Sequence, residues 1–377
     1  MKVLHIFKTY FPDTQGGLEE AIRQISKYTT SQGVENRILT VSDNPIPQRI
    51  KYPEAEVIRY KKTIDIFSTP ISKNFFFDCE QEIKTCDILH FHFPWPFAEM
   101  LFLYKRFAKP SIVTYHADAL KYKWIKFFFK PVIHKYLGQV DKIVATSQPF
   151  LDSSQDLQSF KDKCSVINLS IDDNRFRLSD NDKCEQGSVI KKIESKYGRE
   201  FFLFVGVLRH YKGLEYLIKA MSRLENNLVI IGKGENKGKL SNLAKRLGLN
   251  NVFFLGYIDD KDLPAFYKLS KAFVFPSIDR SEAFGVSLLE AASFSKPMIS
   301  TELSSGTSYV NKHQETGFVV PPRDIEALRT AMLMLSENDE LCSQFGKNAR
   351  KRYERKFTPE ITGKKYLNLY NDILSLK

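Results

Sequence analysis

The chain contains 377 residues, 43% hydrophobic and 27% charged, which excludes a disordered or fibrous protein and leaves room for two domains. With 56 basic and 44 acidic residues the net charge is +12, so either a generally basic solvated surface or anionic partners are expected. No run of 18 apolar residues could span a bilayer, and the first residues predict a buried strand rather than a signal peptide. Five scattered cysteines without a Cys-x2-Cys pair argue for reduced thiols in a cytoplasmic setting.

Short apolar runs alternate with helical patterns along the chain, as parallel sheets with helical crossovers require. The polar stretch from Asp172 to Gly198 predicts a connection between two such series. The pattern therefore predicts an α/β protein with two Rossmann-like domains that face a cleft. The expected strands are Val3–Phe7, Asn36–Val41, Ile88–His92, Ser111–Tyr115, Lys142–Thr146, Phe201–Gly206, Leu228–Ile231, Val252–Leu255, Ala272–Phe275 and Pro297–Ser300.

A glycine pair, Gly16-Gly17, lies between the first expected strand and the first helix. Paired glycines let backbone N–H groups approach a phosphate, and the helix N-terminus adds positive potential. An ordinary strand–helix corner explains the pair equally well.

Histidines stand at the ends of two expected strands. His116 follows Ser111–Tyr115, at the carboxyl edge where α/β proteins bind ligands. His90 and His92 alternate on another strand, a spacing that suits metal ligands, but no third ligand is apparent. Structural or cleft-lining roles are therefore favoured for these two residues. The Asp-x-Asp sequence at 180–182 lies in the polar connection rather than at a strand end, so no metal site is predicted there either.

Residues 121–136 combine five lysines with six aromatic residues. Such a segment suits an anionic membrane surface, with aromatic side chains among the headgroups and lysines on acidic lipid. Single-stranded nucleic acid and an ordinary helix with a buried aromatic face are the alternatives. The membrane surface is favoured.

Two cations, Arg209 and Lys212, follow the first strand of the second series. Fixed there, they would stabilise negative charge on a departing group, although surface cations at a turn are the simpler explanation. The glycines at 232, 234 and 238 approach a dinucleotide-binding pattern. The third is one residue late and no suitable acidic residue follows, so NAD binding is not predicted.

Glu282 and Glu290 bracket a loop and the start of a helix. At helical rise they lie roughly 12 Å apart, a separation that suits a ligand with two hydroxyl-rich ends and a charged middle, such as a sugar nucleotide. Solvated helix carboxylates are the alternative. The apolar residues around Glu290 disfavour it, since an unpaired charge there is costly.

Taken together, these motifs resemble those of the retaining glycosyltransferases of family 4. Within that family the chain is most similar to bacterial polysaccharide and O-antigen mannosyltransferases, through residues 207–213 and 306–311. The resemblance rests on Glu282-x7-Glu290, the opening residues 1–11, Gly16-Gly17, Tyr211-Lys212-Gly213 and Gly317-Phe318-Val319-Val320-Pro321-Pro322.

The resemblance implies the GT-B fold and a role for each motif. The catalytic group would be Glu282, Arg209, Lys212 and His116, with Glu282 on the donor hexose and the two cations on the diphosphate. Many relatives carry arginine where this chain has Val207, and we infer that Arg209 replaces it. The donor site would comprise Gly16, Gly17, Gly232, Tyr257, Ile258, Phe284, Gly285, Val286 and Glu290, with Glu290 on the ribose.

By the same resemblance, residues 1–172 form an acceptor-binding domain and residues 173–357 a nucleotide-sugar-binding domain. The terminal helix, 358–377, crosses back onto the first. The expected function is retaining α-transfer of a hexose, with mannose from GDP-mannose favoured, onto a lipid-linked oligosaccharide of an O-antigen or cell-surface polysaccharide. The enzyme would act in the cytoplasm, peripheral on the cell membrane, without metal or cofactor. The alternatives are a UDP-sugar transferase, a sugar-nucleotide epimerase and a basic nucleic-acid-binding protein. Two cleft carboxylates argue against nucleic acid, because they would repel a phosphate backbone.

Overall fold

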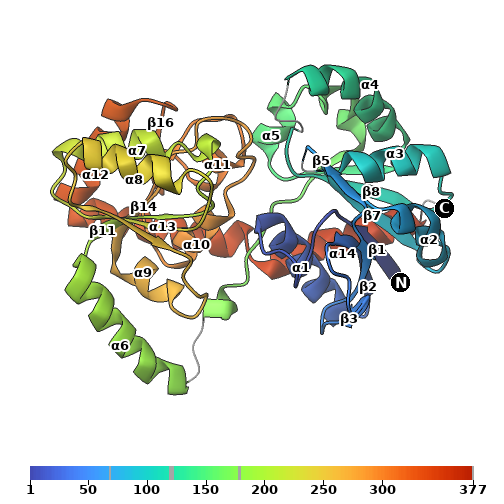
Figure 1. The fold of residues 1–377 in the computed structure, drawn as a ribbon, viewed down its shortest axis with the longest axis horizontal. Coiled ribbons are helices and arrows are strands. Elements are labelled where there is room, and N and C mark those ends of the chain that lie inside the picture. Colours follow the sequence, from blue (N-terminus) through green and yellow to red (C-terminus); the bar gives the residue numbers. More distant parts are fainter. Residues whose placement is uncertain (68, 119–122, 177–179, 376–377) are drawn as a thin grey trace. The chain divides into compact units, whose positions relative to one another are not determined.

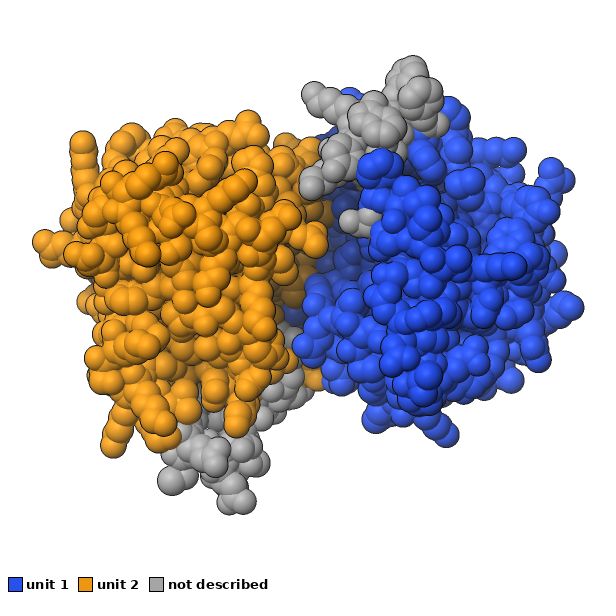
Figure 2. Space-filling model, in the orientation of Figure 1, with its two compact units in different colours: residues 1–171, 358–377 blue, residues 172–357 orange. Residues whose placement is uncertain are grey.

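The computed structural model describes residues 1–67, 69–118, 123–176 and 180–375 (Figure 1). Within these ranges, the side chains of residues 123–128, 174–175 and 180–186 are not described. The chain divides into two compact units (Figure 2). Unit 1 comprises residues 1–171 and 358–377, and unit 2 comprises residues 172–357, so the division falls one residue before the expected one.

Unit 1 is built on an eight-stranded sheet with the order β10-β9-β8-β7-β1-β2-β4-β3. All neighbours pair in parallel except β3, which is antiparallel to β4. Its strands are β1 (Lys2–Ile6), β2 (Glu35–Ser42), β3 (Arg49–Lys51), β4 (Glu56–Lys61), β7 (Ile88–Phe93), β8 (Ser111–Tyr115), β9 (Lys142–Ala145) and β10 (Cys164–Val166), beside a small antiparallel pair, β5 (Ile64–Ile66) and β6 (Thr69–Ile71).

The helices of unit 1 include one from the far end of the chain, α14, which packs against α1. Tyr366 and Tyr370 of α14 enter the same apolar cluster as Val3 of β1 and Ile88 of β7. The terminal helix is therefore part of the core of unit 1. The helices are α1 (Gly17–Ser31), α2 (Lys73–Lys84), α3 (Pro96–Lys105), α4 (Lys123–Gln139), α5 (Gln148–Ser153), η1 (Gln158–Lys163) and α14 (Pro359–Ser375).

Unit 2 has a six-stranded, wholly parallel sheet with the order β13-β12-β11-β14-β15-β16. Its strands are β11 (Phe201–Val205), β12 (Leu228–Ile231), β13 (Val252–Gly256), β14 (Ser270–Phe275), β15 (Met298–Thr301) and β16 (Gly317–Val320). The helical segments are η2 (Asp173–Phe176), α6 (Asp180–Tyr197), η3 (His210–Lys212), α7 (Leu214–Ala220), η4 (Met221–Arg223), α8 (Lys237–Arg246), α9 (Leu263–Leu269), α10 (Val286–Ser293), α11 (Gly306–Val310), α12 (Ile325–Glu337) and α13 (Asp339–Lys356).

Both sheets follow the doubly wound order, in which the chain adds strands first on one side of the initial strand and then on the other. The order reverses between β1 and β7 in unit 1 and between β11 and β14 in unit 2. The predicted fold class, two Rossmann-like domains, is thus confirmed. Ligands of such sheets bind beyond the carboxyl ends of the strands at this reversal, which marks one candidate region in each unit.

The prediction that the polar residues 172–198 form only a connection is wrong, because α6 occupies most of this stretch. Ile193 and Tyr197 are buried near the end of α6, where the helix packs on α9 of unit 2. Tertiary contact therefore supports a helix whose sequence is mostly polar. None of the described helices has the length and apolar composition needed to cross a membrane.

Candidate active site

Lys212 and Glu282 form a buried ion pair at the point where the order of strands reverses in unit 2. Lys212 ends η3, after β11, and Glu282 lies in the loop after β14. Their side chains are 11% and 10% exposed. Ser277 Oγ donates to Glu282 Oε2 at 3.3 Å, and the ammonium of Lys212 lies 4.4 Å from the centre of the Phe275 ring. A cation is thus fixed between a carboxylate and an aromatic face.

A close approach of two backbones brings these residues together across 70 positions of sequence. Gly213 has a φ of 67°, and a Cβ atom there would lie 2.0 Å from the carbonyl oxygen of Pro276. Beside it, the Ile278 N–H donates to the carbonyl of Tyr211 at 2.8 Å. Only glycine fits at position 213, so the loop after β14 lies directly on the turn that carries Lys212.

Helix α10 carries the second carboxylate, Glu290, and is preceded by the capping residue Gly285, which has a φ of 82°. Glu290 is 8% exposed, and the hydroxyl of Tyr267 donates to its Oε2 atom at 2.7 Å. Tyr267 itself is fully buried and stacks on Phe294, with ring centres 5.1 Å apart. The hydrogen bond offsets part of the desolvation cost that the apolar residues of α10 impose on this carboxylate.

The residues between the two carboxylates differ in what they expose. Phe284 is 3% exposed as a whole residue, and its ring meets Phe357 edge-on at 6.1 Å. Val286, the first residue of α10, is half-buried. The loop from Glu282 to Gly285 is therefore buried within unit 2, and its place in the donor site stays a prediction.

The loops after β11 and β12 touch through their glycines. A Cβ atom on Gly232 would lie 1.9 Å from the carbonyl oxygen of Gly206. The Leu208 N–H donates to the carbonyl of Lys233 at 2.9 Å. Packing of the two backbones accounts for the glycine at 232, and its place in the donor site stays a prediction.

Arg209 and Tyr257 are exposed side chains at the same edge of the sheet. Tyr257 is 54% exposed, and the ammonium of Lys233 lies 5.3 Å from its ring centre. Val207 is 50% exposed, Ile258 is half-buried, and within the described ranges Arg209 forms no ion pair. The Arg209 side chain is therefore accessible to an anionic ligand. Of the two cations after β11, Arg209 and Lys212, Lys212 is the one that contacts Glu282.

In unit 1, His116 lies buried just beyond β8, and its backbone N–H donates to the carbonyl of Phe93 at 3.2 Å. Its ring stacks on His92, and its Nε2 atom lies 3.1 Å from His92 Nδ1. Burial lowers the pKa of His116 to about 3, so its imidazole is neutral. Its Nδ1 atom is buried without a hydrogen-bond partner among the described residues.

The prediction that His90 and His92 have no third potential metal ligand beside them is wrong, because His5 on β1 joins them. One ring nitrogen from each of the three histidines lies within 4.8 Å of the other two. However, His90 is hydrogen-bonded by Tyr370 and Thr114 through its two nitrogens, each at 2.7 Å. The arrangement is therefore a hydrogen-bonded core rather than an open set of lone pairs.

The loop before α1 is held by Glu19, which accepts hydrogen bonds from Thr9 at 2.8 Å and Thr14 at 2.7 Å. Gly16 and Gly17 are exposed, and a Cβ atom on Gly16 would lie 2.7 Å from the Glu19 carboxylate. The glycine thus accommodates a carboxylate beneath the loop. An anion bound at these amides would lie near that negative charge.

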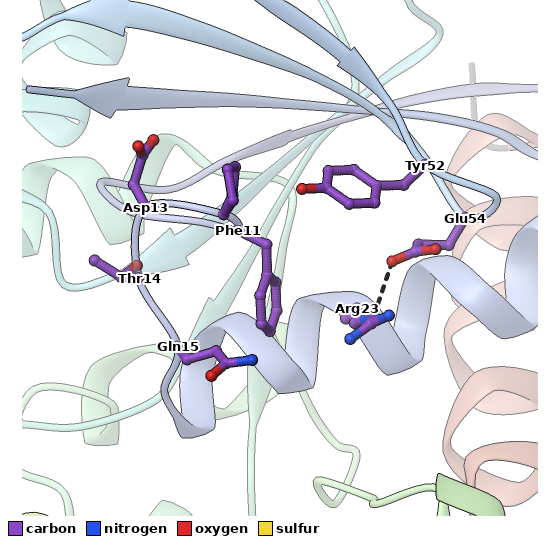
Figure 3. A pocket seen from close by; sticks show the side chains of 8 residues that line it. Phe11, Asp13, Thr14, Gln15, Arg23, Tyr52 and Glu54 are labelled. Carbon is purple, nitrogen blue, oxygen red and sulfur yellow. Dashed lines mark hydrogen bonds and ion pairs between the residues drawn. The ribbon is translucent and has the colours of Figure 1, made fainter. Parts of the chain in front are cut away.

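A pocket of about 400 Å³ lies beside this loop, within unit 1 (Figure 3). Arg23 pairs with Glu54 at 2.9 Å, and the Arg23 guanidinium lies 5.1 Å from the centre of the Phe11 ring. Figure 3 shows the hydroxyl of Tyr52 directed into the pocket, toward the side on which Asp13 lies. Aromatic faces with several polar side chains are suited to a sugar ring. The lining residues are Phe11, Pro12, Asp13, Thr14, Gln15, Arg23, Tyr52 and Glu54.

The segment 121–136 falls partly outside the described residues, as do the side chains of Asp180-Asn181-Asp182. In the described part of α4, Ile133 and Tyr136 are buried, whereas Lys130 and Lys135 are exposed. Tyr136 meets Phe102 edge-on at 5.4 Å. This aromatic residue therefore belongs to the core of unit 1, and the two lysines face solvent.

Several residues of these sites were not predicted from the sequence. Ser277 and Tyr267 orient the two carboxylates, but a serine after a strand and a tyrosine in a short helix carry no distinctive signal. His5 carries only a weak signal, as a single polar residue within the apolar run that predicts the first strand. The pocket residues Arg23 and Tyr52 come together only through the fold.

Comparisons with known proteins bear on the family and the fold of this chain. Residues 15–175 match the family model described as Glycosyltransferase Family 4, and residues 186–352 match the model described as Glycosyl transferases group 1. The D-rhamnosyltransferase WbpZ of Pseudomonas aeruginosa is 39% identical over 358 residues, covering 95% of this chain and 92% of that protein. The O-antigen chain mannosyltransferase C of Escherichia coli is 38% identical over the whole of both chains. The structure of Anabaena HepE in complex with UDP and glucose matches with a TM-score of 0.74 and 18% identity, over 98% of this chain and 99% of that one.

Proposed function

Because this chain belongs to glycosyltransferase family 4 and has the two Rossmann-like domains of the GT-B fold, we propose that it is a retaining mannosyltransferase. It takes mannose from GDP-mannose and adds it to a lipid-linked glycan of an O-antigen or a related cell-surface polysaccharide. The mannosyl group is supported by the 38% identity to the O-antigen mannosyltransferase. A nucleotide-sugar donor is supported by the fold shared with the UDP complex.

The buried Lys212–Glu282 pair is the observation that carries this proposal. When a glycosidic bond to a nucleoside diphosphate breaks, negative charge grows on the leaving oxygen. A fixed ammonium beside that oxygen lowers the barrier without needing to reorganise. Among the described residues, both side-chain contacts to Glu282 fall on Oε2. Its Oε1 atom is therefore left to accept hydrogen bonds from hexose hydroxyls.

Arg209 and Glu290 complete the donor site. The exposed Arg209 guanidinium supplies a second cation for the diphosphate, in place of the arginine that Val207 replaces. Glu290 accepts hydrogen bonds from the ribose diol, in an orientation fixed by Tyr267. The leaving phosphate itself takes the proton of the acceptor hydroxyl, since no dedicated base–nucleophile pair adjoins this site among the residues that the structure describes. The two cations serve the diphosphate without a metal ion.

The pocket beside Phe11 and Tyr52 is the proposed subsite for a sugar of the acceptor. Its aromatic residues offer apolar faces to a pyranose ring, and Asp13 and Glu54 offer carboxylate oxygens to hydroxyl groups. Tyr52→Ala is expected to raise the acceptor KM about tenfold, which corresponds to one lost contact of about 1.4 kcal/mol. Hydrolysis of the donor without acceptor should stay at the parent rate. Equal losses in both assays would contradict an acceptor role.

A donor panel tests the proposed sugar directly. The protein is incubated with GDP-mannose, UDP-glucose, UDP-galactose and UDP-GlcNAc, and release of nucleoside diphosphate is measured without acceptor. Turnover with GDP-mannose alone supports the proposal, and turnover with a UDP-sugar alone contradicts it. Thermal stabilisation by GDP, with none by a single-stranded oligonucleotide, separates the enzyme from a nucleic-acid-binding protein.

D-Rhamnose transfer is the second candidate, supported by 39% identity to the D-rhamnosyltransferase. D-Rhamnose is mannose without its 6-hydroxyl group, so a site that hydrogen-bonds this group distinguishes the two sugars strongly. The ratio of kcat/KM for GDP-mannose and GDP-D-rhamnose measures that difference. A ratio in favour of rhamnose would replace the mannosyl proposal without affecting the rest of the site.

Docking on an anionic membrane through residues 121–136 also belongs to this proposal. It is supported by the exposed Lys130 and Lys135 and by the net charge of +12. Lys130→Glu with Lys135→Glu should reduce sedimentation with acidic vesicles, whereas the matched change of Lys347 and Lys351, exposed on α13 of unit 2, should not. Equal losses in both variants would indicate net charge alone.

A further inference from the structure

Four groups form a continuous chain of hydrogen bonds across neighbouring strands of unit 1. Asn36 of β2 lies 3.2 Å from His5 Nε2, through its Oδ1 atom. His5 Nδ1 lies 3.1 Å from His92 Nε2, and His92 Nδ1 lies 3.1 Å from His116 Nε2. All four side chains are buried, with at most 4% exposed. The chain runs along β2, β1, β7 and the end of β8, and it crosses the point where the order of strands reverses.

The hydrogen bonds at the Asn36 end fix the direction of the chain. Asn36 Nδ2 lies 3.2 Å from the carbonyl oxygen of Ser26, which can only accept. It also lies 2.9 Å from Thr29 Oγ1 and 2.8 Å from Thr30 Oγ1. These two hydroxyls already donate to the carbonyls of Ile25 and Glu54, so their lone pairs face the amide nitrogen. The Asn36 Oδ1 atom must therefore accept from His5.

The direction then passes from ring to ring. Burial lowers the pKa of His5 to about 4 and that of His92 well below its usual value, so each imidazole carries one N–H. His5 donates from Nε2, which leaves its Nδ1 to accept from His92 Nε2. His92 Nδ1 then accepts from His116 Nε2. By this sequence His116 holds its proton on Nε2, and its Nδ1 atom keeps a free lone pair.

We propose that Asn36, His5 and His92 are positioning residues that hold His116 in one tautomer, so that its Nδ1 atom accepts a hydrogen bond from a sugar hydroxyl in the transfer reaction. The proposal rests on the proposed function for the identity of that hydroxyl. Among the ring nitrogens of these histidines, His116 Nδ1 is the one that is buried without a hydrogen-bond partner in the described structure. A bare lone pair repels phosphate oxygens and attracts O–H groups, so it selects the sugar rather than the diphosphate.

Two other uses of this cluster fit the contacts less well. Proton transport is disfavoured because the row of hydrogen bonds ends at the Asn36 amide, which neither gains nor loses a proton near neutral pH. A metal ion bound by His5, His90 and His92 would have to take lone pairs that already accept hydrogen bonds or displace donors from both ends. The contacts favour a set of hydrogen bonds that fixes the tautomer and the orientation of His116.

Nitrogen NMR of the full-length protein labelled with ¹⁵N-histidine tests the proposal, because the two ring nitrogens of each tautomer have distinct shifts. His116 is expected to show a protonated Nε2 and an unprotonated Nδ1, and the Nδ1 signal should move on addition of GDP-mannose but not of GDP. A protonated Nδ1 in the parent protein, or no difference between the two nucleotides, would overturn the proposal. Stoichiometric binding of Zn²⁺ with loss of these signals would also overturn it.

Variants separate orientation from general stability. Asn36→Leu removes the group that fixes the direction, so His116 should populate both tautomers and kcat should fall about tenfold. Asn36→Gln keeps an amide that can donate to the Ser26 carbonyl and accept from His5, and it should restore the single tautomer. Tyr370→Phe is the matched core control, since it removes a buried hydroxyl from His90 outside the chain. An unchanged tautomer in Asn36→Leu refutes the positioning role of Asn36. A correct tautomer without turnover of any nucleotide sugar refutes the proposed function instead.

Discussion

Lowering the pH from 7 to 5 should destabilise unit 1 through its buried histidines. Burial lowers the pKa of His5 to about 4 and of His116 to about 3, whereas both have a pKa of about 6.5 in the unfolded chain. Below pH 6.5 the unfolded state therefore binds more protons than the folded state. Linkage then makes the free energy of unfolding fall as the pH falls. Each of the two histidines removes roughly 2 kcal/mol between pH 7 and pH 5. His90 and His92 act in the same direction.

Glu99 acts in the opposite direction. Burial raises its pKa to about 8, so its carboxyl group stays protonated in the folded protein while the unfolded chain loses the proton above pH 4.5. This group destabilises the folded state as the pH rises, by roughly 2–3 kcal/mol between pH 5 and pH 7. The measured slope is the difference between the two effects, and variants are needed to separate them.

Urea unfolding followed by tryptophan fluorescence reports on unit 1, because both tryptophans of the chain lie within its sequence range. His116→Gln should reduce the dependence of unfolding free energy on pH by roughly 1 kcal/mol per pH unit between pH 4 and 6, whatever its effect at pH 7. His210→Gln changes an exposed residue of unit 2, whose sequence contains no tryptophan, and is the control. If His116→Gln has the same pH dependence as the parent, the imidazole is not held neutral and the reasoning fails.

Other variants test the remaining parts of the structure. Glu99→Gln should make unit 1 more sensitive to acid by removing the opposing carboxyl group, as followed by the same urea titrations; an unaltered slope would exclude a buried neutral acid. Gly213→Ala should cost roughly 2 kcal/mol or more in unfolding free energy, because its φ is 67° and the new Cβ would strike Pro276. Normal stability there would contradict the close approach. Lys212→Ala and Arg209→Ala should each lower kcat more than they raise the donor KM, since their contacts strengthen as charge develops. Steady-state kinetics with near-normal turnover in either variant would remove that cation from the mechanism.

The ribose contact is tested with a pair of matched substitutions. Glu290→Gln keeps a carbonyl acceptor for Tyr267 but loses the charge, and donor affinity should fall by roughly 1.5–3 kcal/mol. Tyr267→Phe keeps the carboxylate and should lower stability more than donor affinity. Isothermal titration with GDP measures the donor affinity of both variants, and urea unfolding measures their stability. Equal affinity in Glu290→Gln and the parent would place the ribose elsewhere.

The two sheets were predictable from the sequence because their inner strands are almost wholly apolar. In β7 all six residues are buried, and the expected strand Ile88–His92 ends one residue early. The side of the sheet beyond β2 was harder to predict. In β4, charged residues interrupt the apolar ones, and the buried Arg59 pairs with Asp13 at 3.0 Å. A pattern of single residues does not show such long-range compensation.

The candidate site shows the same limit. Lys212 and Glu282 were recognisable as motif residues, but their direct pairing depends on the contact of Gly213 with Pro276. The partners of His116 are 24 and more positions away in sequence and meet through the register of parallel strands. Sequence spacing predicts neighbours on one strand, and the register decides the neighbours across strands.

The position of α14 has a consequence for biosynthesis. Its residues Tyr366 and Tyr370 fill the core of unit 1 and bond to Thr114 and His90, and Gly363 lets the helix pass close to Tyr28 of α1. A ribosome therefore completes all of unit 2 while unit 1 still lacks this helix. During that interval Val3, Ile88 and the other residues of this apolar cluster lack the side chains of α14 that pack on them in the finished protein. The first domain to be translated is thus the last to be finished, and the nascent chain needs protection from aggregation until α14 emerges.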